Sequence, residues 1–188
     1  MAWEGLVRVP STLRLALAAG LALATSCSSA FARDRETWRC TASNGSYQVN
    51  NPPMWDKTTI ISGRINFHSA DFGEGFSSWA KIGFSDSKFQ TPDDHCHCNG
   101  LLVKAWPNPD RLGFYMLTDG ETEMFDIGRK LDTPITFKIS IDPNGLMTVQ
   151  VGKEHMETKT SMLSHAQRDT LLMFCTGADV SFLNVNPQ

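Results

Sequence analysis

The chain has 188 residues, of which 41% are hydrophobic and 20% are charged, and its formal net charge at pH 7 is −3. This length is sufficient for one domain with a hydrophobic core. The 17 basic residues form no cluster, which argues against nucleic acid or an anionic membrane surface as a partner.

Residues 1–32 have the pattern of a secretory signal peptide. Basic residues precede the apolar run 15–24, and Ala30-Phe31-Ala32 fits a cleavage site with small residues. This run is too short for a transmembrane helix, and no later stretch approaches the roughly 18 apolar residues of a membrane span. We therefore expect an exported protein, secreted or periplasmic, with a single domain over residues 33–188. An uncleaved anchor and a lipid anchor at Cys27 are the alternatives.

The cysteines of the expected domain are even in number, which in an exported protein predicts two disulfide bonds. They are Cys40, Cys96, Cys98 and Cys175. In extended backbone Cys96 and Cys98 point the same way, and a bond between them would be strained, so we expect each to pair with Cys40 or Cys175. A zinc site that includes His95 and His97 is the alternative, although zinc prefers four converging ligands with more widely spaced cysteines.

Short segments of alternating apolar and polar residues follow one another from residue 58 onward. The clearest is 133–153, in which Phe137, Ile139 and Ile141 share a face before the turn Asp142-Pro-Asn-Gly145, so it predicts an antiparallel hairpin. Further strands are expected near 58–70, 77–85, 100–106, 111–118, 122–128, 155–163, 170–176 and 178–185. The one helical turn that we expect lies in 161–168. About ten strands and at most one short helix predict an all-β sandwich or barrel.

Two segments resemble the concanavalin A-like lectin and glucanase superfamily. They are TFKISIDPNGLMTVQVGK, residues 136–153, and LLMFCTGADVSFLNVNP, residues 171–187. The first has a D-x-x-G turn between two strands, and the second is a late strand with the ending F-x-N-V. The resemblance implies an antiparallel two-sheet jelly-roll sandwich with one concave sheet, on which relatives bind or cleave carbohydrates.

Four segments in the middle of the chain carry aromatic and hydrogen-bonding side chains at the positions that alternate with apolar ones. These side chains are Trp79, Trp106, Tyr115, Lys81, Lys104, Asn66 and His68. Aromatic rings pack on the apolar faces of sugars, and charged or amide groups bind sugar hydroxyls. If the four segments are neighbours in one sheet, they predict a carbohydrate-binding surface. The alternative is that Trp79 and Trp106 form a second small core under loops.

The segment TDGETEMFDIG, residues 118–128, resembles a degenerate form of the E-x-D-x-x-E signature of laminarinase-like glycoside hydrolases. The resemblance implies Glu121 as nucleophile, Glu123 as assisting acid and Asp126 as acid/base. The second and third acids are exchanged relative to that signature. A regular strand would also point Glu121 and Glu123 toward the core, because they share parity with Phe125. An ordinary turn with solvated acids is therefore the favoured interpretation.

We expect no cofactor, and calcium is the alternative. The resemblance implies it, and Asp119, Glu121 and Glu123 alternate along the segment, although the glycine and final glutamate of an EF-hand are missing. The sequence as a whole favours an exported, lectin-like carbohydrate-binding sandwich without catalysis. A small glycoside hydrolase or polysaccharide lyase with acids in 119–126, and a structural or protein-interaction domain, are the alternatives.

Overall fold

The structure is a computed structural model that describes residues 35–188 except 55–56, 74–76, 86–97, 108–109 and 163–168. Arg35–Gln188 form one compact unit. The expected signal peptide, most of the His-Cys segment and the expected helical turn therefore lie outside the described residues. Within the described part, no helix has the length and apolar character needed to cross a membrane.

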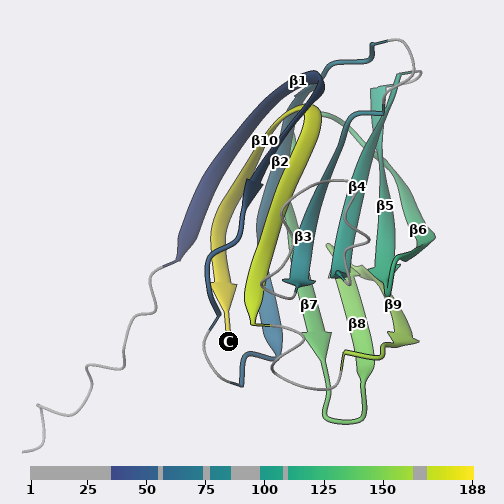
Figure 1. Cartoon of the computed structure of the whole chain (residues 1–188). Coiled ribbons are helices and arrows are strands. Elements are labelled where there is room, and N and C mark those ends of the chain that lie inside the picture. The colour runs from purple at the N-terminus through teal and green to yellow at the C-terminus, as the bar shows by residue number, and fades with distance from the viewer. Residues whose placement is uncertain (1–34, 55–56, 74–76, 86–97, 108–109, 163–168) are drawn as a thin grey trace, which may run out of the picture. The chain divides into compact units, whose positions relative to one another are not determined.

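Ten strands account for the regular structure of the described residues, which confirms the all-β prediction (Figure 1). They are β1 (Glu36–Asn50), β2 (Ile60–Ala70), β3 (Trp79–Ser85), β4 (Asn99–Pro107), β5 (Asp110–Thr118), β6 (Glu121–Arg129), β7 (Ile135–Ile141), β8 (Leu146–Val151), β9 (Glu154–Lys159) and β10 (Thr170–Pro187). The segments expected at 170–176 and 178–185 form one continuous strand. The expected strands do not include β1.

Two long strands, β1 and β10, pass from one sheet to the other. β10 pairs with β3 through residues 170–176 and with β2 through residues 178–187, on either side of Gly177, whose φ of 57° bends the strand. β1 follows the same bend with an irregularity between Ala42 and Tyr47.

The bend gives a two-sheet sandwich, as predicted (Figure 1). The first sheet has the order β1–β10–β3–β4–β5–β6 and contains residues 47–50 of β1 and 170–176 of β10. The second sheet has the order β1–β10–β2–β7–β8–β9 and contains residues 36–42 of β1 and 178–187 of β10.

The main core lies between the inner faces of the two sheets. It includes Phe84 and Phe114 from the first sheet and Phe67, Phe137 and Phe182 from the second, all of them buried. The burial of one such ring is worth roughly 1.5–3 kcal/mol. In β7 burial alternates residue by residue, which confirms the predicted hairpin pattern and leaves the outer face of the second sheet in contact with solvent.

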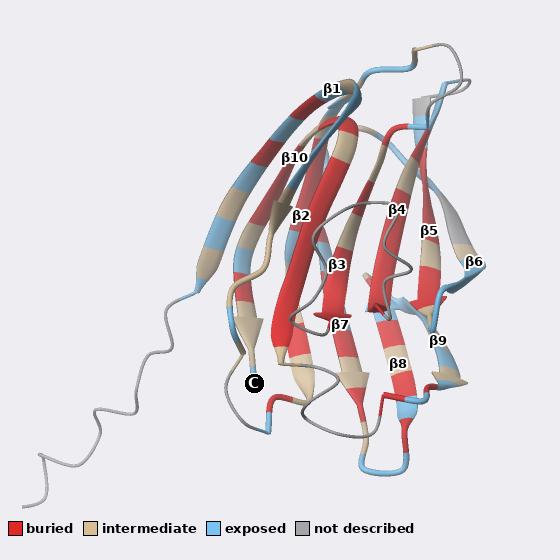
Figure 2. Ribbon diagram, in the orientation of Figure 1, coloured by how far each residue is buried: buried red, intermediate tan, exposed pale blue. Residues whose placement is uncertain are grey.

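A second hydrophobic cluster lies on the outer face of the first sheet. It consists of Cys98, Leu117, Leu172 and Phe174, with half-buried Val49 and Trp79 packed against it. As a result β10 is buried on both faces from Thr170 to Cys175, which Figure 2 shows as a nearly continuous red band. The outer faces of the two sheets therefore differ, because among the described residues only the first sheet carries a hydrophobic cluster on its outer face.

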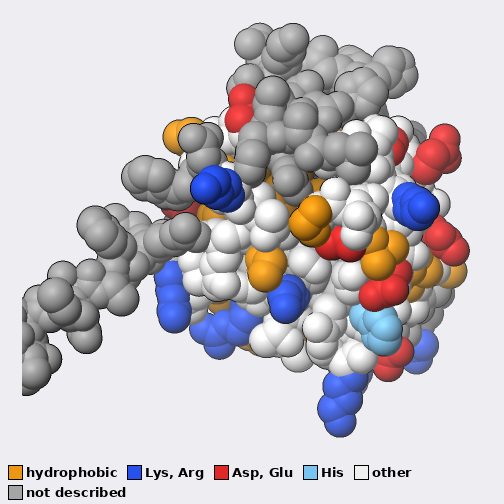
Figure 3. All heavy atoms as spheres, turned by 90° about the horizontal axis from the view of Figure 1, so that it is seen from below, with side chains coloured by type: hydrophobic (Ala, Val, Ile, Leu, Met, Phe, Trp, Pro, Cys, Tyr) orange, Lys and Arg blue, Asp and Glu red, His pale blue; other side chains and the backbone are white. Residues whose placement is uncertain are grey.

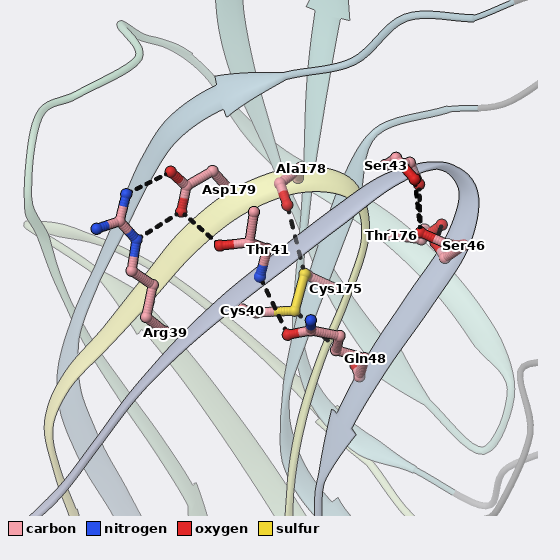
Figure 4. Close-up of a disulfide and its surroundings, with 10 residues drawn as sticks. All are labelled: Arg39, Cys40, Thr41, Ser43, Ser46, Gln48, Cys175, Thr176, Ala178 and Asp179. Atoms are coloured by element: carbon pink, nitrogen blue, oxygen red, sulfur yellow. Dashed lines mark hydrogen bonds and ion pairs between the residues drawn. A yellow bond between two sulfur atoms is a disulfide. The ribbon is translucent and has the colours of Figure 1, made fainter.

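A disulfide joins Cys40 in the second sheet to Cys175 in the first, with their Cα atoms 6.1 Å apart (Figure 4). The expectation that Cys96 and Cys98 each pair with one of these cysteines is therefore wrong. Where β1 and β10 bend from one sheet to the other, at a corner of the sandwich, Cys40 and Cys175 meet in the main core. The alternation of residues along one strand does not reveal this contact. Cys98 is also disulfide-bonded.

Candidate functional site

Strand register places the predicted aromatic and lysine side chains of β3, β4 and β5 on one face. Trp79 lies opposite Lys104, and Lys81 belongs to the next row, which continues through Leu102 to Tyr115. Opposite residues of antiparallel strands point to the same side, and the residues that alternate with these are in the main core. The outer face of the first sheet therefore carries Trp79, Lys81, Lys104, Trp106 and Tyr115.

Asn66 and His68 do not belong to this face. They lie in β2, which pairs with β7 and with the second half of β10, and so they are on the outer face of the second sheet. The hypothesis of one shared surface is therefore wrong for these two residues. Alternation correctly predicts that they point away from the core, but it cannot tell which sheet a strand joins.

One end of the outer face of the first sheet is hollowed into a cavity of about 580 Å³. Its lining is Phe72, Gly73, Ser77, Lys104, Ala105, Trp106, Pro107 and Tyr115. Trp106 is 44% exposed, an unusually open position for the largest side chain. Three of the predicted ligand residues thus meet in one concave site, together with Phe72, which comes from the β2–β3 loop.

The position of Trp106 depends on a glycine in the neighbouring strand. Gly113 lies opposite Lys104, and a Cβ atom there would be 2.8 Å from Trp106 Nε1 and 3.1 Å from Tyr115 Cε2. Both rings therefore occupy the space that a side chain at residue 113 would fill. The Lys104 ammonium lies 5.3 Å from the centroid of the Tyr115 ring, within the range of a cation–π contact.

Trp79 has a different environment from Trp106. Its ring stacks on Phe174 with centroids 4.6 Å apart, and it packs against the second hydrophobic cluster. The alternative of a second small core therefore describes Trp79 but not Trp106. Lys81 also contacts Trp79, with its ammonium 4.6 Å from the Trp79 ring centroid.

The pKa of Lys81 lies below the ordinary value of a lysine. Burial lowers the pKa of Lys81, and repulsion from Lys104 lowers it further. Both effects disfavour the charged form of the side chain. The outer face of the first sheet therefore contains a partly desolvated cation beside a second cation.

The candidate catalytic acids lie on the other side of the β5–β6 pair. Glu121 is opposite Thr118 and Glu123 is opposite Met116, a core residue, so both point to the inner side at the edge of the sandwich, as their parity predicts. They line a separate cavity of about 310 Å³ with Met116, Thr118, Thr122 and Thr158. A bulge follows them, because Tyr115 pairs with Met124 whereas Phe114 pairs with Asp126, whose side chain lies outside the described residues.

Asp119, the first of the three acids suggested for calcium, takes part in a local network. Its carboxylate accepts hydrogen bonds from the Ser161 backbone N–H at 2.9 Å, Asn99 Nδ2 at 3.1 Å and Thr160 Oγ1 at 3.2 Å. Burial opposes ionisation, but these hydrogen bonds outweigh it and lower the pKa of Asp119. No group of three His, Cys, Asp or Glu side chains within the described ranges converges as a metal site. Calcium binding by Asp119, Glu121 and Glu123 stays a prediction.

The outer face of the second sheet holds a hydrogen-bonded chain of three residues. Ser181 Oγ lies 2.9 Å from His68 Nε2, and His68 Nδ1 lies 2.9 Å from Asp132 Oδ1, which is the order of a serine hydrolase triad. However, Ser181 is paired on both sides, with β1 and with β2, so the surrounding N–H groups belong to the ladders and cannot form an oxyanion hole. The chain instead fastens the β6–β7 loop to the sheet, and it lowers the pKa of Asp132 through the His68 hydrogen bond.

The sequence matches no protein-family model and no protein of curated function. Among solved structures, the metal-free carbohydrate recognition domain of Emp46p has a TM-score of 0.50 at 13% identity, with 79% of this chain and 80% of that chain covered. An alginate lyase from Pseudomonas aeruginosa has a TM-score of 0.48 at 14% identity and covers 70% of this chain, which spans 65% of the lyase. A carbohydrate-binding module from Bacillus subtilis has a TM-score of 0.45 at 12% identity, with coverages of 81% and 90%.

At these identities the likeness concerns the fold alone. The chain has the concanavalin A-like β-sandwich fold, as its hairpin and its last strand indicate. Because this fold supports more than one activity, the function must be argued from the site.

Proposed function

We propose that the protein is an exported lectin-like protein that binds carbohydrate, without catalysis, on the outer face of the first sheet. The observation that carries this proposal is the cavity in which Trp106, Tyr115 and Lys104 converge. Its volume of about 580 Å³ is within the range of small-molecule sites.

The chemistry of the cavity suits a sugar. The exposed ring of Trp106 offers a flat apolar surface for the C–H face of a pyranose, and Phe72, 37% exposed, offers a second ring. The Lys104 ammonium, the Tyr115 hydroxyl and Ser77 can hydrogen-bond sugar hydroxyls. The fold supports the proposal, since it is similar to that of a carbohydrate recognition domain.

The proposal is tested by screening the purified protein on a glycan array and titrating each hit while following tryptophan fluorescence. Trp106→Ala should weaken binding roughly five- to tenfold, because stacking on an aromatic ring is worth about 1–1.5 kcal/mol. Met124→Ala is the matched control, because Met124 is 48% exposed on the same face, opposite Tyr115, but does not line the cavity. Equal affinities of wild type and Trp106→Ala would contradict the proposed site. A folded protein that binds no glycan would instead favour a protein-interaction domain.

A glycan hydrolase or lyase is the second candidate, because the exposed carboxylates of Glu121 and Glu123 line a cavity of their own. These acids and the Trp106 ring lie on opposite sides of the first sheet, so a sugar stacked on Trp106 does not meet them. We expect no turnover of any glycan that binds. Hydrolysis or elimination that Glu121→Gln abolishes would reverse the order of the two candidates.

A further inference from the structure

We propose that the ligand is an acidic carbohydrate, with carboxylate or sulfate groups that bind Lys104 and Lys81 while a sugar ring stacks on Trp106. This inference rests on the proposed carbohydrate site and adds the chemical class of the ligand. It is carried by the sign, the position and the pairing of the charges on the outer face of the first sheet.

The outward-facing residues that the structure describes in the first sheet include three cations and no acid. The cations are Lys81, Lys104 and Arg111, which lies opposite Trp106. Asp71, in the loop that supplies Phe72, does not line the cavity, and its carboxylate accepts a hydrogen bond from the Asn44 backbone at 2.9 Å. The chain as a whole is negatively charged, with a net charge of −3, so this face differs in sign from the protein that carries it.

Neither lysine forms an ion pair with a residue of the described part. The ion pair found there is Arg39–Asp179, on the second sheet, where His68 also forms a hydrogen bond with Asp132. The two ammonium groups instead lie over the rings of Trp79 and Tyr115. A partly buried ammonium without a counter-ion is unfavourable, and a second cation beside it adds repulsion.

The arrangement also places the charges next to the aromatic cavity. Lys104 lines the cavity, two residues before Trp106 in β4, and Lys81 is its diagonal neighbour in β3. A ligand that stacks on Trp106 and extends across β4 toward β3 would bring anionic groups first to Lys104 and then to Lys81. Such groups would supply a counter-ion that the described residues do not provide, and they would relieve the repulsion between the two ammonium groups.

The test compares an oligouronate with its carboxyl-reduced form, which keeps the sugar rings and linkages but loses the charge. A sulfated oligosaccharide and its desulfated form make the second arm. The acidic member of at least one pair should bind at least tenfold more tightly, since a hydrogen bond to a charged group is worth about 1.5–3 kcal/mol. Which pair shows this preference distinguishes carboxylate from sulfate. Its affinity should fall as salt is added.

The variants separate the site lysines from general charge. Lys104→Gln should lose at least tenfold in affinity for the acidic glycan and keep the affinity for its neutral form. Lys138→Gln removes an exposed lysine from the outer face of the second sheet and should change neither affinity. Thermal unfolding of each variant checks that the fold is retained, and Lys81→Met serves as a second site variant.

The remaining outcomes would contradict either the acidic ligand alone or the carbohydrate site as well. Neutral members that bind as tightly as acidic ones overturn the inference but leave the carbohydrate site intact. An acidic preference that Lys138→Gln reduces as much as Lys104→Gln also overturns it. Binding of no glycan, acidic or neutral, overturns both the inference and the proposed function.

Discussion

On the outer face of the second sheet, Arg39 donates hydrogen bonds to Asp179 at 2.9 and 2.6 Å, and His68 is bonded to Asp132 at 2.9 Å. On the outer face of the first sheet, the two lysines lie over aromatic rings instead. Figure 3 shows the molecule from below relative to Figure 1, and on this side acidic and basic side chains lie together.

The comparison supports the proposed location of the ligand on the first sheet. Paired charges on a solvated face, as in the second sheet, satisfy one another and contribute little net stability. At the cavity of the first sheet, the Lys104 ammonium can still form hydrogen bonds, and the Trp106 ring still exposes apolar surface, so both can contact a ligand. This difference is the reason that we propose the outer face of the first sheet as the ligand site.

The largest predicted effect concerns the corner that both sheets share. The Cys40–Cys175 disulfide closes a loop with a sequence separation of 135 residues. Replacing both cysteines with serine should lower the free energy of unfolding by about 4 kcal/mol, measured by denaturant titration, because the unfolded chain gains entropy. A loss below about 1 kcal/mol would show that the paired strands β1 and β10 hold the corner without the cross-link.

The next effect separates the two tryptophans of the first sheet. Trp79→Ala should lower the free energy of unfolding by about 3 kcal/mol, because the ring is stacked on Phe174 in the second hydrophobic cluster. Trp106→Ala should cost less than about 1 kcal/mol, because its ring is largely open to solvent. If both variants lose the same stability, the distinction between a buried Trp79 and an exposed Trp106 on this face is wrong.

A smaller effect should appear in binding when the cavity is distorted but none of its groups is removed. Gly113→Ala places a methyl group where the indole of Trp106 now lies and should weaken glycan binding about tenfold. The affinity is measured by the same fluorescence titration. Unchanged affinity with a retained fold would mean that the ligand does not use the present position of Trp106.

The same two faces show how far sequence patterns can predict this protein. Strict alternation predicts the β7–β8 hairpin residue by residue, and it places Trp79, Lys104 and Tyr115 on an outward face. The strand β1 is missed, although Trp38, Cys40 and Ala42 alternate with polar residues and could have indicated it.

Other features depend on contacts that no local pattern encodes. The bend at Gly177 decides that β2 and β3 join different sheets, and this separates Asn66 and His68 from the lysines. The pairing of Cys40 with Cys175 follows from the same bend. Phe72 reaches the cavity from an irregular loop, where periodicity gives no signal.

The smallest predicted effects are in the pH dependence of stability, and they have opposite origins on the two faces. The Arg39 hydrogen bonds lower the pKa of Asp179, so their contribution is present above the ordinary value of 3.8 and is lost as the pH falls through the lowered value. Arg39→Gln should therefore be slightly less stable than wild type at pH 6, and the difference should vanish in acid.

Lys81 should instead affect how the free energy of unfolding changes at alkaline pH. Its pKa is lowered by burial and then by Lys104, so the folded state releases the proton first, and stability rises between the lowered value and the ordinary 10.5. Lys81→Met should be more stable than wild type at pH 7, by on the order of 1 kcal/mol, and this advantage should shrink as the pH approaches 10.5. Thermal unfolding across the alkaline range measures it. An advantage that stays constant with pH would come from packing of the methionine rather than from an uncompensated charge on this face.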